Sequence, residues 1–183
     1  MVGNANWASA QTCSGGLSYM TFGGNHYWHC NESVTQAVAQ ARCAAFVPPG
    51  GTGYYLARPE TPAEATAIVN MANFTSGSRW IGAMDSTVEG RWDWTDGSRA
   101  TWNGVNVVNA PTGTVPWNSG EPNDSGGEDC AEIIDGTTRW NDLGCGASRG
   151  FVCEGVITPR LSCITNDAPC CSVTFFGGRE YRY

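Results

Sequence analysis

Lysine is absent from this chain, and charge of either sign is scarce: Asp, Glu, Lys and Arg together make up 15% of its 183 residues. All ten basic residues are arginines, and 17 acidic residues outnumber them, so the formal net charge at pH 7 is −7. A protein that binds nucleic acid needs a basic surface to neutralise the phosphates. The composition therefore argues against nucleic acid as a partner.

Long apolar runs are also missing. No segment approaches the roughly 20 apolar residues of a membrane-spanning helix, so no membrane span is predicted. Residues 1–12 have neither the charged start nor the apolar core of a signal peptide. Hydrophobic residues nevertheless make up 41% of the chain, which is typical of a folded protein. The length suits one ordinary domain with short extensions.

The nine cysteines are too many for an ordinary cytosolic protein of this size. They indicate disulfides and an oxidising compartment, so we expect a secreted, extracellular protein. Zinc is the alternative, but the chain has no C-x-x-C pair, and His26 and His29 lie far from most of the cysteines in the sequence. The odd count leaves at least one cysteine free, capped or paired between chains.

Two helices are predicted in the first half of the chain. Ser33-Val34-Thr35-Gln36 has the form of a capping box, so the first helix is expected to open at Ser33. Its apolar stripe consists of Val34, Ala37, Val38, Ala41 and Ala45. The second is expected to begin at Thr61-Pro62, because proline is favoured at the first helical position. Its apolar face consists of Ile68, Val69 and Ala72.

Short strands are predicted on both sides of these helices. Residues 19–22 and 26–28 flank Gly23-Gly24, which is the turn signal of a hairpin. Further strands are expected at 80–84, 91–94, 130–134, 138–140 and 150–154. Between 97 and 127 lies a long stretch rich in Asn, Gly, Thr and Pro, and loops of this length inside a domain are usually functional or disordered.

Acidic and amide side chains gather in and around this stretch. The carboxylates are Asp85, Glu89, Glu121, Asp124, Glu128, Asp129 and Asp142, and Asn123 and Asn141 lie among them. Calcium takes about six to eight oxygen ligands from carboxylates and carbonyls, which several loops together could supply. Without a cation, such crowding would raise some of the carboxyl pKa values and destabilise the fold. Two calcium ions would offset four of the seven charges.

The order of these motifs resembles the C-type lectin family over roughly residues 13–154. The resemblance is carried by Trp80-Ile81-Gly82, Glu121-Pro122-Asn123, Glu128-Asp129-Cys130, Trp140-Asn141-Asp142, Cys145 and Phe151-Val152-Cys153. It implies an α+β, C-type lectin-like fold with two helices, small antiparallel sheets, a long ligand-binding loop region and disulfide staples. Residues 1–12 are then an N-terminal extension, 13–154 the domain, and 155–183 a Cys-rich tail.

The resemblance also implies ligands. A principal calcium ion, which binds two vicinal sugar hydroxyls directly, would be held by Glu121, Asn123, Glu128, Asn141 and Asp142. An auxiliary calcium ion would be held by Asp85, Glu89, Asp124, Glu128 and Asp129. The Glu-Pro-Asn order implies mannose-type sugars with equatorial 3- and 4-hydroxyls, whereas the Gln-Pro-Asp order that favours galactose is absent. Pro122 is expected in the cis form.

Disulfides follow from the same resemblance, which implies the pairs Cys43–Cys153, Cys130–Cys145 and Cys13–Cys30. Three tail cysteines, Cys163, Cys170 and Cys171, lie outside the pattern. Because adjacent cysteines do not easily bridge each other, the tail pairs within itself, reaches back or links chains into a homo-oligomer.

Three glycosylation sequons are present. Asn31 and Asn73 are candidates for modification. Asn123 is expected to be unmodified, because a glycan there would destroy the proposed sugar site.

Two rival functions remain to be weighed. Paired carboxylates are typical of glycosidases, but here they cluster with Asn and have no conspicuous His, Cys or Ser nucleophile motif beside them, so we expect no enzyme. The other rival is a structural or adhesive protein of the same fold that self-assembles or binds a protein or surface partner. The complete set of metal-site residues favours a calcium-dependent lectin.

Overall fold

The computed structural model describes Cys13, residues 17–46, 53–72, 77–108 and 116–156, and the backbone of two tail strands. The first half of the domain contains β1 (Leu17–Phe22), β2 (Asn25–Val34), α1 (Gln36–Ala44), β3 (Tyr55–Leu56) and α2 (Pro62–Ala72). The second half contains β4 (Arg79–Met84), β5 (Asp93–Trp94), β6 (Thr101–Trp102), β7 (Val105–Asn106), β8 (Cys130–Ile133), β9 (Trp140–Leu143) and β10 (Arg149–Val156).

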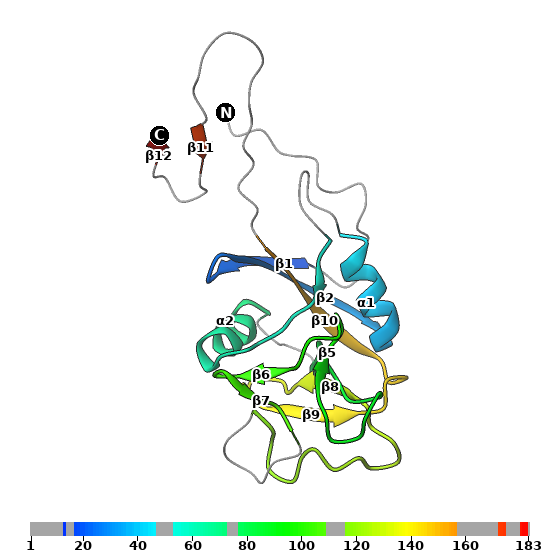
Figure 1. Ribbon diagram of the computed structural model, residues 1–183. Helices are drawn as coiled ribbons and strands as arrows, with labels where there is room; N and C mark the ends of the chain where they lie inside the picture. The colour runs from blue at the N-terminus through cyan, green and yellow to red at the C-terminus, as the bar shows by residue number, and fades with distance from the viewer. Residues whose placement is uncertain are drawn as a thin grey trace.

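Eight of these strands form one sheet, with the order β1-β2-β10-β4-β8-β9 and with β3 on β10 and β5 on β4. Among the described strands, the pairings are antiparallel except between β10 and β4. The last strand of the domain therefore lies between its first hairpin and its second half. Figure 1 shows α1 and α2 on opposite sides of β2 and β10, and β8 and β9 at the end that carries the long loops. The predicted α+β class is confirmed, but its main sheet is larger than expected and mixed.

The predicted hairpin at Gly23-Gly24 is confirmed. Strand β1 pairs antiparallel with β2, and Phe22 lies opposite Asn25 across the turn. Both glycines have positive φ, at 59° and 89°, a region that side chains with a Cβ avoid. Two glycines in sequence therefore indicated the position of this turn.

The start predicted for the first helix is wrong. Helix α1 begins at Gln36 rather than Ser33, and Thr35 precedes it without a side-chain capping bond. Ser33 and Val34 belong to β2, where Val34 pairs with Arg149 of β10. Pairing with a strand that lies more than 100 residues away in the sequence overrides the local capping preference. The capping pattern depends only on neighbouring residues, so it cannot predict this pairing.

The buried face of α1 also differs from the predicted stripe. Gln36, Ala39 and Cys43 are buried, whereas Val38 of the predicted stripe is 42% exposed. The disulfide between Cys43 and β10 decides which side of the helix faces the sheet. Helix α2 fits its prediction better: it begins at Pro62, and Ile68 is fully buried.

Two strands begin later in the sequence than predicted. The strand expected at 138–140 begins only at Trp140, because residues 134–139 form the turn between β8 and β9, where the N–H of Ile134 donates to the carbonyl of Arg139 over 2.8 Å. Of the segment 91–94, only β5 is a strand, although Arg91 forms an isolated bridge with Val108.

Tryptophans form the core under the long loops. Trp92, Trp94, Trp117 and Trp140 are at most 2% exposed. The ring centroids of Trp92 and Trp117 lie 4.6 Å apart, and those of Trp117 and Trp140 lie 5.7 Å apart. Such edge and tilted contacts stabilise a core beyond the burial of area. Since Trp117 is packed in this way, it anchors the loop to the core.

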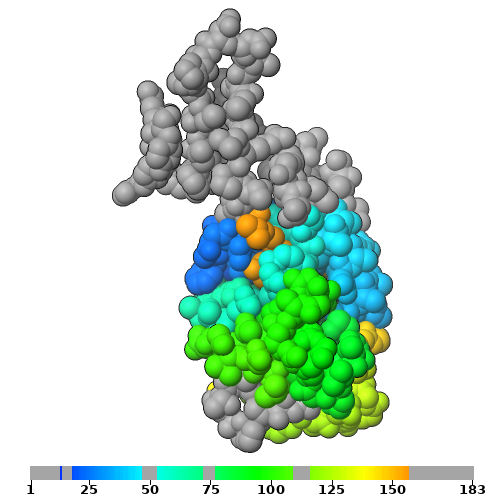
Figure 2. All heavy atoms as spheres, in the orientation of Figure 1, coloured from blue at the N-terminus to red at the C-terminus, as the bar shows by residue number. Residues whose placement is uncertain are grey.

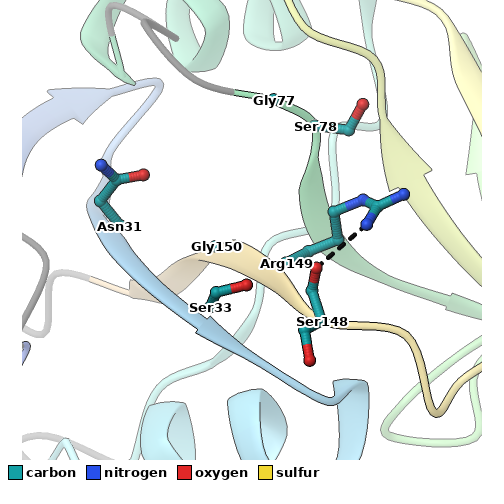
Figure 3. A pocket seen from close by; sticks show the side chains of 7 residues that line it. All are labelled: Asn31, Ser33, Gly77, Ser78, Ser148, Arg149 and Gly150. Atoms are coloured by element: carbon teal, nitrogen blue, oxygen red, sulfur yellow. Dashed lines mark hydrogen bonds between the residues drawn. The ribbon is translucent and has the colours of Figure 1, made fainter.

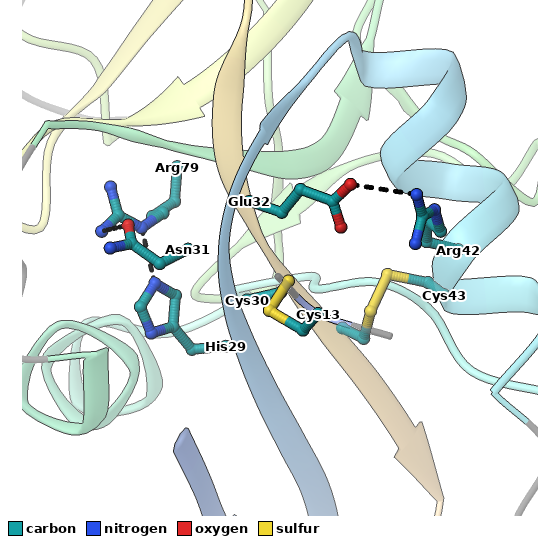
Figure 4. The surroundings of a disulfide bond; sticks show 9 residues. Cys13, His29, Cys30, Asn31, Glu32, Arg42, Cys43 and Arg79 are labelled. Atoms are coloured by element: carbon teal, nitrogen blue, oxygen red, sulfur yellow. Dashed lines mark hydrogen bonds and ion pairs between the residues drawn. A yellow bond between two sulfur atoms is a disulfide. The ribbon is translucent and has the colours of Figure 1, made fainter. Parts of the chain in front are cut away.

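Three disulfides close the described part of the domain, and they join Cys13 to Cys30, Cys43 to Cys153 and Cys130 to Cys145. These are the pairs that the resemblance implies. Figure 4 shows the Cys13–Cys30 bond on β2, beside the Cys43 disulfide at α1. The bridges tie the first hairpin, the first helix and the loop region to the central sheet, and longer closed loops give more stabilisation of this kind.

Little of the tail is described. Strand β11 (Ser172–Thr174) pairs antiparallel with β12 (Glu180–Arg182) in a separate two-stranded sheet. Cys163, Cys170 and Cys171 lie outside the described residues, and so does the candidate sequon asparagine Asn73. Within the described residues, neither helix has the length and apolar character needed to cross a membrane.

Candidate metal centre

Asp142 organises the loops at the end of the sheet. It lies in β9, is 1% exposed, and accepts through Oδ2 the backbone N–H groups of Asn123 at 2.8 Å and Asp124 at 2.7 Å. This one carboxylate oxygen therefore holds the whole Glu121–Asp124 turn against the sheet. Among the described residues, no group donates a hydrogen bond to the other oxygen, Oδ1, although it is buried.

A buried carboxylate oxygen without a donor is rare in folded proteins and needs an explanation. A bound cation is one that fits the chemistry, because an oxygen ligand to calcium needs no hydrogen-bond donor. The residue type, the burial and the free oxygen of Asp142 all agree with a metal ligand.

The turn itself carries the first two of the predicted principal ligands, Glu121 and Asn123. The Glu121–Pro122 peptide bond is cis, as predicted. The Asn123 amide nitrogen donates to Oε2 of Glu121, so the two side chains lie together on the outer side of the turn. Figure 2 shows the yellow-green atoms of this loop region on the surface at the lower edge of the domain.

Glu128 closes the loop from the other side. Its backbone N–H donates to Oδ1 of Asp124 over 2.8 Å, and its Oε2 accepts the N–H of Ser125 at 3.2 Å. Asp124 itself has a positive φ of 48°, a conformation in which Asp is more frequent than most other residues. The structure thus brings Glu121, Asn123, Asp124, Glu128 and Asp142 together in one loop cluster, and Asn141 precedes Asp142 on β9.

A second acidic group lies beside the first. One carboxylate oxygen from each of Asp85, Glu89 and Asp129 lies within 4.8 Å of the others. Asp85 is 2% exposed, and its Oδ2 accepts the N–H of Gly90 at 2.9 Å. Its Oδ1 is buried with no donor among the described residues, as at Asp142. Three of the five residues predicted for an auxiliary ion therefore have an arrangement that could hold one.

The crowding of carboxylates in both groups raises the pKa values of some of them. Burial, together with the charges of Glu89, Asp129 and Asp142, raises the pKa of Asp85 to about 6, although the N–H of Gly90 acts in the opposite direction. Burial also raises the pKa of Glu121, and the nearby charges of Asp142 and Glu128 raise it further. These carboxyl groups are held close enough together that a proton, or a cation in its place, relieves their repulsion.

Sequence reasoning missed two charged residues beside this cluster. Glu132 of β8 is 5% exposed, its Oε1 accepts from the Asn141 amide nitrogen at 3.2 Å, and its Oε2 accepts from Nε of Arg149 at 2.5 Å. The sequence did contain a signal for Glu132, since it lies inside a predicted strand of otherwise apolar residues. A carboxylate buried in such a strand needs a charged or hydrogen-bonding partner.

A polar pocket of about 370 Å³ lies elsewhere, between β2, the start of β4 and the start of β10 (Figure 3). It is lined by Asn31, Ser33, Gly77, Ser78, Ser148, Arg149 and Gly150. None of the predicted calcium ligands lies in it. The candidate sequon residue Asn31 accepts through Oδ1 from the Arg79 guanidinium at 2.8 Å, which leaves its amide nitrogen as the end that a glycan would use (Figure 4).

Comparison with known proteins identifies a family model and several relatives that match this chain. A family model described as "Lectin C-type domain" matches residues 32–155. The "Alpha-N-acetylgalactosamine-specific lectin" of Patiria pectinifera is 30% identical over 140 residues, which are 73% of this chain and 75% of that protein. The "CD209 antigen-like protein D" of Mus musculus is 38% identical over 107 residues, which are 58% of this chain and 39% of that protein. The chain therefore spans well under half of that second relative.

A solved structure of a C-type lectin domain is also similar to this chain. The carbohydrate-recognition domain of the mouse scavenger receptor C-type lectin matches with a TM-score of 0.60 and 26% identity. The match covers 78% of this chain and 96% of that domain.

Proposed function

The chain belongs to the C-type lectin family, and on that premise we propose that it binds mannose-type sugars through a calcium ion held by its long loops. The family model is a lectin domain and the Patiria relative is named as a lectin, in agreement with the expectation that the chain is not an enzyme. The observation that carries the proposal is Asp142, a fully buried carboxylate with one oxygen holding the Glu121–Asp124 turn and the other without a donor among the described residues.

The proposed principal ion has five protein ligands: Glu121, Asn123, Glu128, Asn141 and Asp142. When bound, it supplies two coordination positions for a pair of vicinal sugar hydroxyls. The side chains at the edge of the site recognise the same hydroxyls, because carboxylates accept hydrogen bonds from them and amide nitrogens donate to them. Glu121 and Asn123 already contact each other on the outer side of the turn, where a sugar would reach both.

The sugar class follows from the Glu-Pro-Asn order and not from the relatives. The Patiria lectin is named for N-acetylgalactosamine, so family membership alone leaves the sugar open. A carboxylate at 121 and an amide at 123 suit equatorial 3- and 4-hydroxyls of the mannose type. One shallow site makes few contacts, so a monosaccharide is expected to bind with a Kd on the order of 1 mM, and useful avidity needs several copies.

An auxiliary calcium ion is proposed at Asp85, Glu89, Asp124, Glu128 and Asp129. Its support is the convergence of the first, second and last of these carboxylates, together with the buried free oxygen of Asp85. An ion there would neutralise charges next to the principal site and stiffen the loop that carries both sets of ligands.

An extracellular location is proposed from the three disulfides, which form and persist in oxidising compartments. We keep the division into an extension over 1–12, a lectin domain over 13–154 and a tail over 155–183. Asn31 and Asn73 remain proposed glycosylation sites, and Asn123 is proposed to stay unmodified. Self-assembly through the tail cysteines is the route by which the chain would become multivalent.

Calorimetric titration tests the proposal. Calcium is added to the chelated protein, and mannose is then added with and without calcium, with galactose as the matched sugar control. Calcium binding followed by calcium-dependent mannose binding supports the lectin. Calcium binding without any sugar response favours the adhesive or assembly alternative, and no calcium binding overturns the ligand assignments.

A further inference from the structure

Glu132 is a charged residue in a place that suits an apolar one. It lies inside β8, where Cys130, Ala131 and Ile133 are also buried. Removing a carboxylate from water is unfavourable unless its oxygens are paired. Arg149 of β10 pairs with one of them, since its Nε lies 2.5 Å from Oε2, and the Glu132 side chain is 6% exposed against 33% for the arginine.

The second oxygen of Glu132 reaches a proposed calcium ligand. Strands β8 and β9 are antiparallel, and Glu132 lies directly opposite Asn141 in their register. The Asn141 amide nitrogen, Nδ2, donates to Oε1 of Glu132 over 3.2 Å and to the backbone carbonyl of Asp142 over 2.7 Å. A continuous chain of polar contacts therefore runs from Arg149 through Glu132 to the Asn141 side chain.

These two partners decide which way the Asn141 amide faces. A carboxylate oxygen and a backbone carbonyl only accept hydrogen bonds, so the NH₂ end of the amide must face them. The Oδ1 end then faces the other way and is available to a cation. With the amide turned over, Oδ1 would lie against the carboxylate, and an N–H group would point toward the positive ion.

We propose that Glu132 and Arg149 act as positioning residues for calcium: Arg149 holds Glu132, and Glu132 holds the Asn141 amide with its oxygen presented to the principal ion. This inference rests on the proposed function, because it takes Asn141 as a ligand. It adds two residues that lie outside both predicted ligand sets. Partners of this kind change metal affinity by about 10- to 100-fold when they are removed.

The negative charge of Glu132 could also strengthen calcium binding directly. This effect has to be separated from its effect on the orientation of the Asn141 amide. Its carboxylate contacts the Asn141 amide directly, so its charge lies beside a proposed ligand. Glu132→Gln removes the charge and keeps an oxygen that can accept from Asn141. Glu132→Met removes both. Orientation is the main effect if Glu132→Gln retains most of the calcium affinity that Glu132→Met loses.

Calcium titration into the chelated proteins measures the effect. We expect Glu132→Met and Arg149→Met to weaken calcium binding by about 10- to 100-fold, and Arg149→Lys to stay within about threefold because it keeps the positive charge beside Glu132. The matched control is Glu32→Gln, which removes the 3.0 Å ion pair with Arg42 between β2 and α1 and touches no proposed ligand (Figure 4). Its calcium affinity should equal that of the wild type.

Thermal unfolding of each chelated variant separates positioning from stability. A purely structural role lowers the melting temperature of the chelated Glu132→Met and Arg149→Met proteins but leaves their calcium affinity unchanged, and that result overturns the inference. If Glu132→Met does not fold, Glu132→Gln and Arg149→Lys still decide the question, because these isosteric or charge-preserving variants must then retain calcium binding better than Arg149→Met.

The NMR signals of the Asn141 side-chain amide distinguish failure of this inference from failure of the proposed function. In the chelated wild type, we expect the two Nδ2 protons of Asn141 to exchange slowly with solvent and to have chemical shifts displaced from those of an exposed amide. Both features should be lost in Glu132→Met. Exposed-like signals in the wild type overturn the inference whatever calcium does. An ordered amide in a wild type that binds no calcium overturns the proposed function and, with it, the positioning role. Equal calcium affinity in wild type and Glu132→Met overturns the positioning role alone.

Discussion

Two groups of buried carboxylates in this domain have different partners. Glu154 at the end of β10 is 3% exposed, and both of its oxygens accept hydrogen bonds: one from the Asn25 amide at 2.7 Å and one from the N–H of Arg58 at 2.8 Å. Asp85 and Asp142 in the loop region are equally buried, but each keeps one oxygen without a donor among the described residues.

Glu64 of α2 belongs with Glu154. Its oxygens accept from the Tyr27 hydroxyl at 2.6 Å and from the N–H of Glu60 at 3.0 Å. In the strand-and-helix half, the chain therefore supplies the donors that Glu64 and Glu154 need. At Asp85 and Asp142 in the loop half it does not, and a cation from solution fits the remaining oxygens. Glu32 of β2 and Asp135 also have one buried oxygen without a donor among the described residues. A missing donor therefore points to a cation only where further carboxylates lie close by, as they do at Asp85 and Asp142.

The largest effect is expected when the charge of Asp142 is removed. Asp142→Asn keeps an oxygen that can hold the Glu121–Asp124 turn, but it withdraws the anionic ligand, so the calcium Kd should rise by more than about 100-fold, beyond the range of supporting residues. Calorimetric titration checks this. Glu154→Gln is the control from the other half, and calcium should bind to it as to the wild type. Wild-type affinity in Asp142→Asn would remove the distinction between the two groups.

A smaller effect is expected when the ligand order is changed within the loop half. Glu121→Gln combined with Asn123→Asp produces Gln-Pro-Asp, and the preference should move from mannose toward galactose by roughly tenfold, or about 1.4 kcal/mol. Competition of the two sugars for immobilised protein measures the shift. Calcium affinity is measured in parallel and should change little, because positions 121 and 123 together still supply one carboxylate and one amide. An unchanged sugar preference would mean that other residues choose the sugar.

The other half should respond to pH in the direction opposite to ordinary acid denaturation. Burial raises the pKa of Glu154 to about 7, above the ~4.3 of a free glutamate, so the folded chain holds this proton more tightly than the unfolded chain. The contribution of Glu154 is then fully present below the unfolded pKa. It is lost as pH rises through the folded pKa, and each pH unit between the two pKa values removes about 1.4 kcal/mol of stability.

Urea unfolding of the chelated protein at about pH 5 and about pH 8 tests this slope, and Glu154→Gln should reduce it. The part that remains comes from Asp85, whose pKa is raised to about 6. The calcium-loaded protein adds the opposite trend, because acid protonates the carboxylates that hold the metal and releases it. A chelated Glu154→Gln protein with the wild-type slope would show that Glu154 is ionised when folded.

The smallest effect is expected on the outer face of α1. Val38 is 42% exposed, so Val38→Lys should change the free energy of unfolding by no more than about 0.5 kcal/mol. Chemical denaturation measures the change. A loss above about 2 kcal/mol would mean that Val38 lies in the core, as the apolar stripe predicts, and that α1 packs on the sheet through a different face.

Much of the molecule follows from local signals. Gly23-Gly24 marks a hairpin because few other residues adopt two positive φ angles in succession, and Pro62 marks the start of α2 because proline suits the first helical turn. The ordered motifs at 121–123, 128–130 and 140–142 indicate the family. They also name the residues that the structure collects around Asp142.

Other features depend on residues far apart in the chain. Helix α1 begins at Gln36 because β2 continues to Val34 against β10, and its buried face follows from the bond of Cys43 to Cys153. The strand expected at 138–140 starts late because the β8–β9 turn occupies the residues before Trp140. Local propensity is a weak preference that strand pairing and disulfides override.

By itself, the sequence determined the types of residue at the proposed site, their order, and the family to which the chain belongs. Only the tertiary structure decided which carboxylate oxygens have donors among the described residues: Asp142 lacks one at Oδ1, Glu154 lacks none, and Glu132 is shared between Arg149 and Asn141. The reason is that a hydrogen bond requires its partners within about 3 Å, and that distance is set by the pairing of strands distant in sequence.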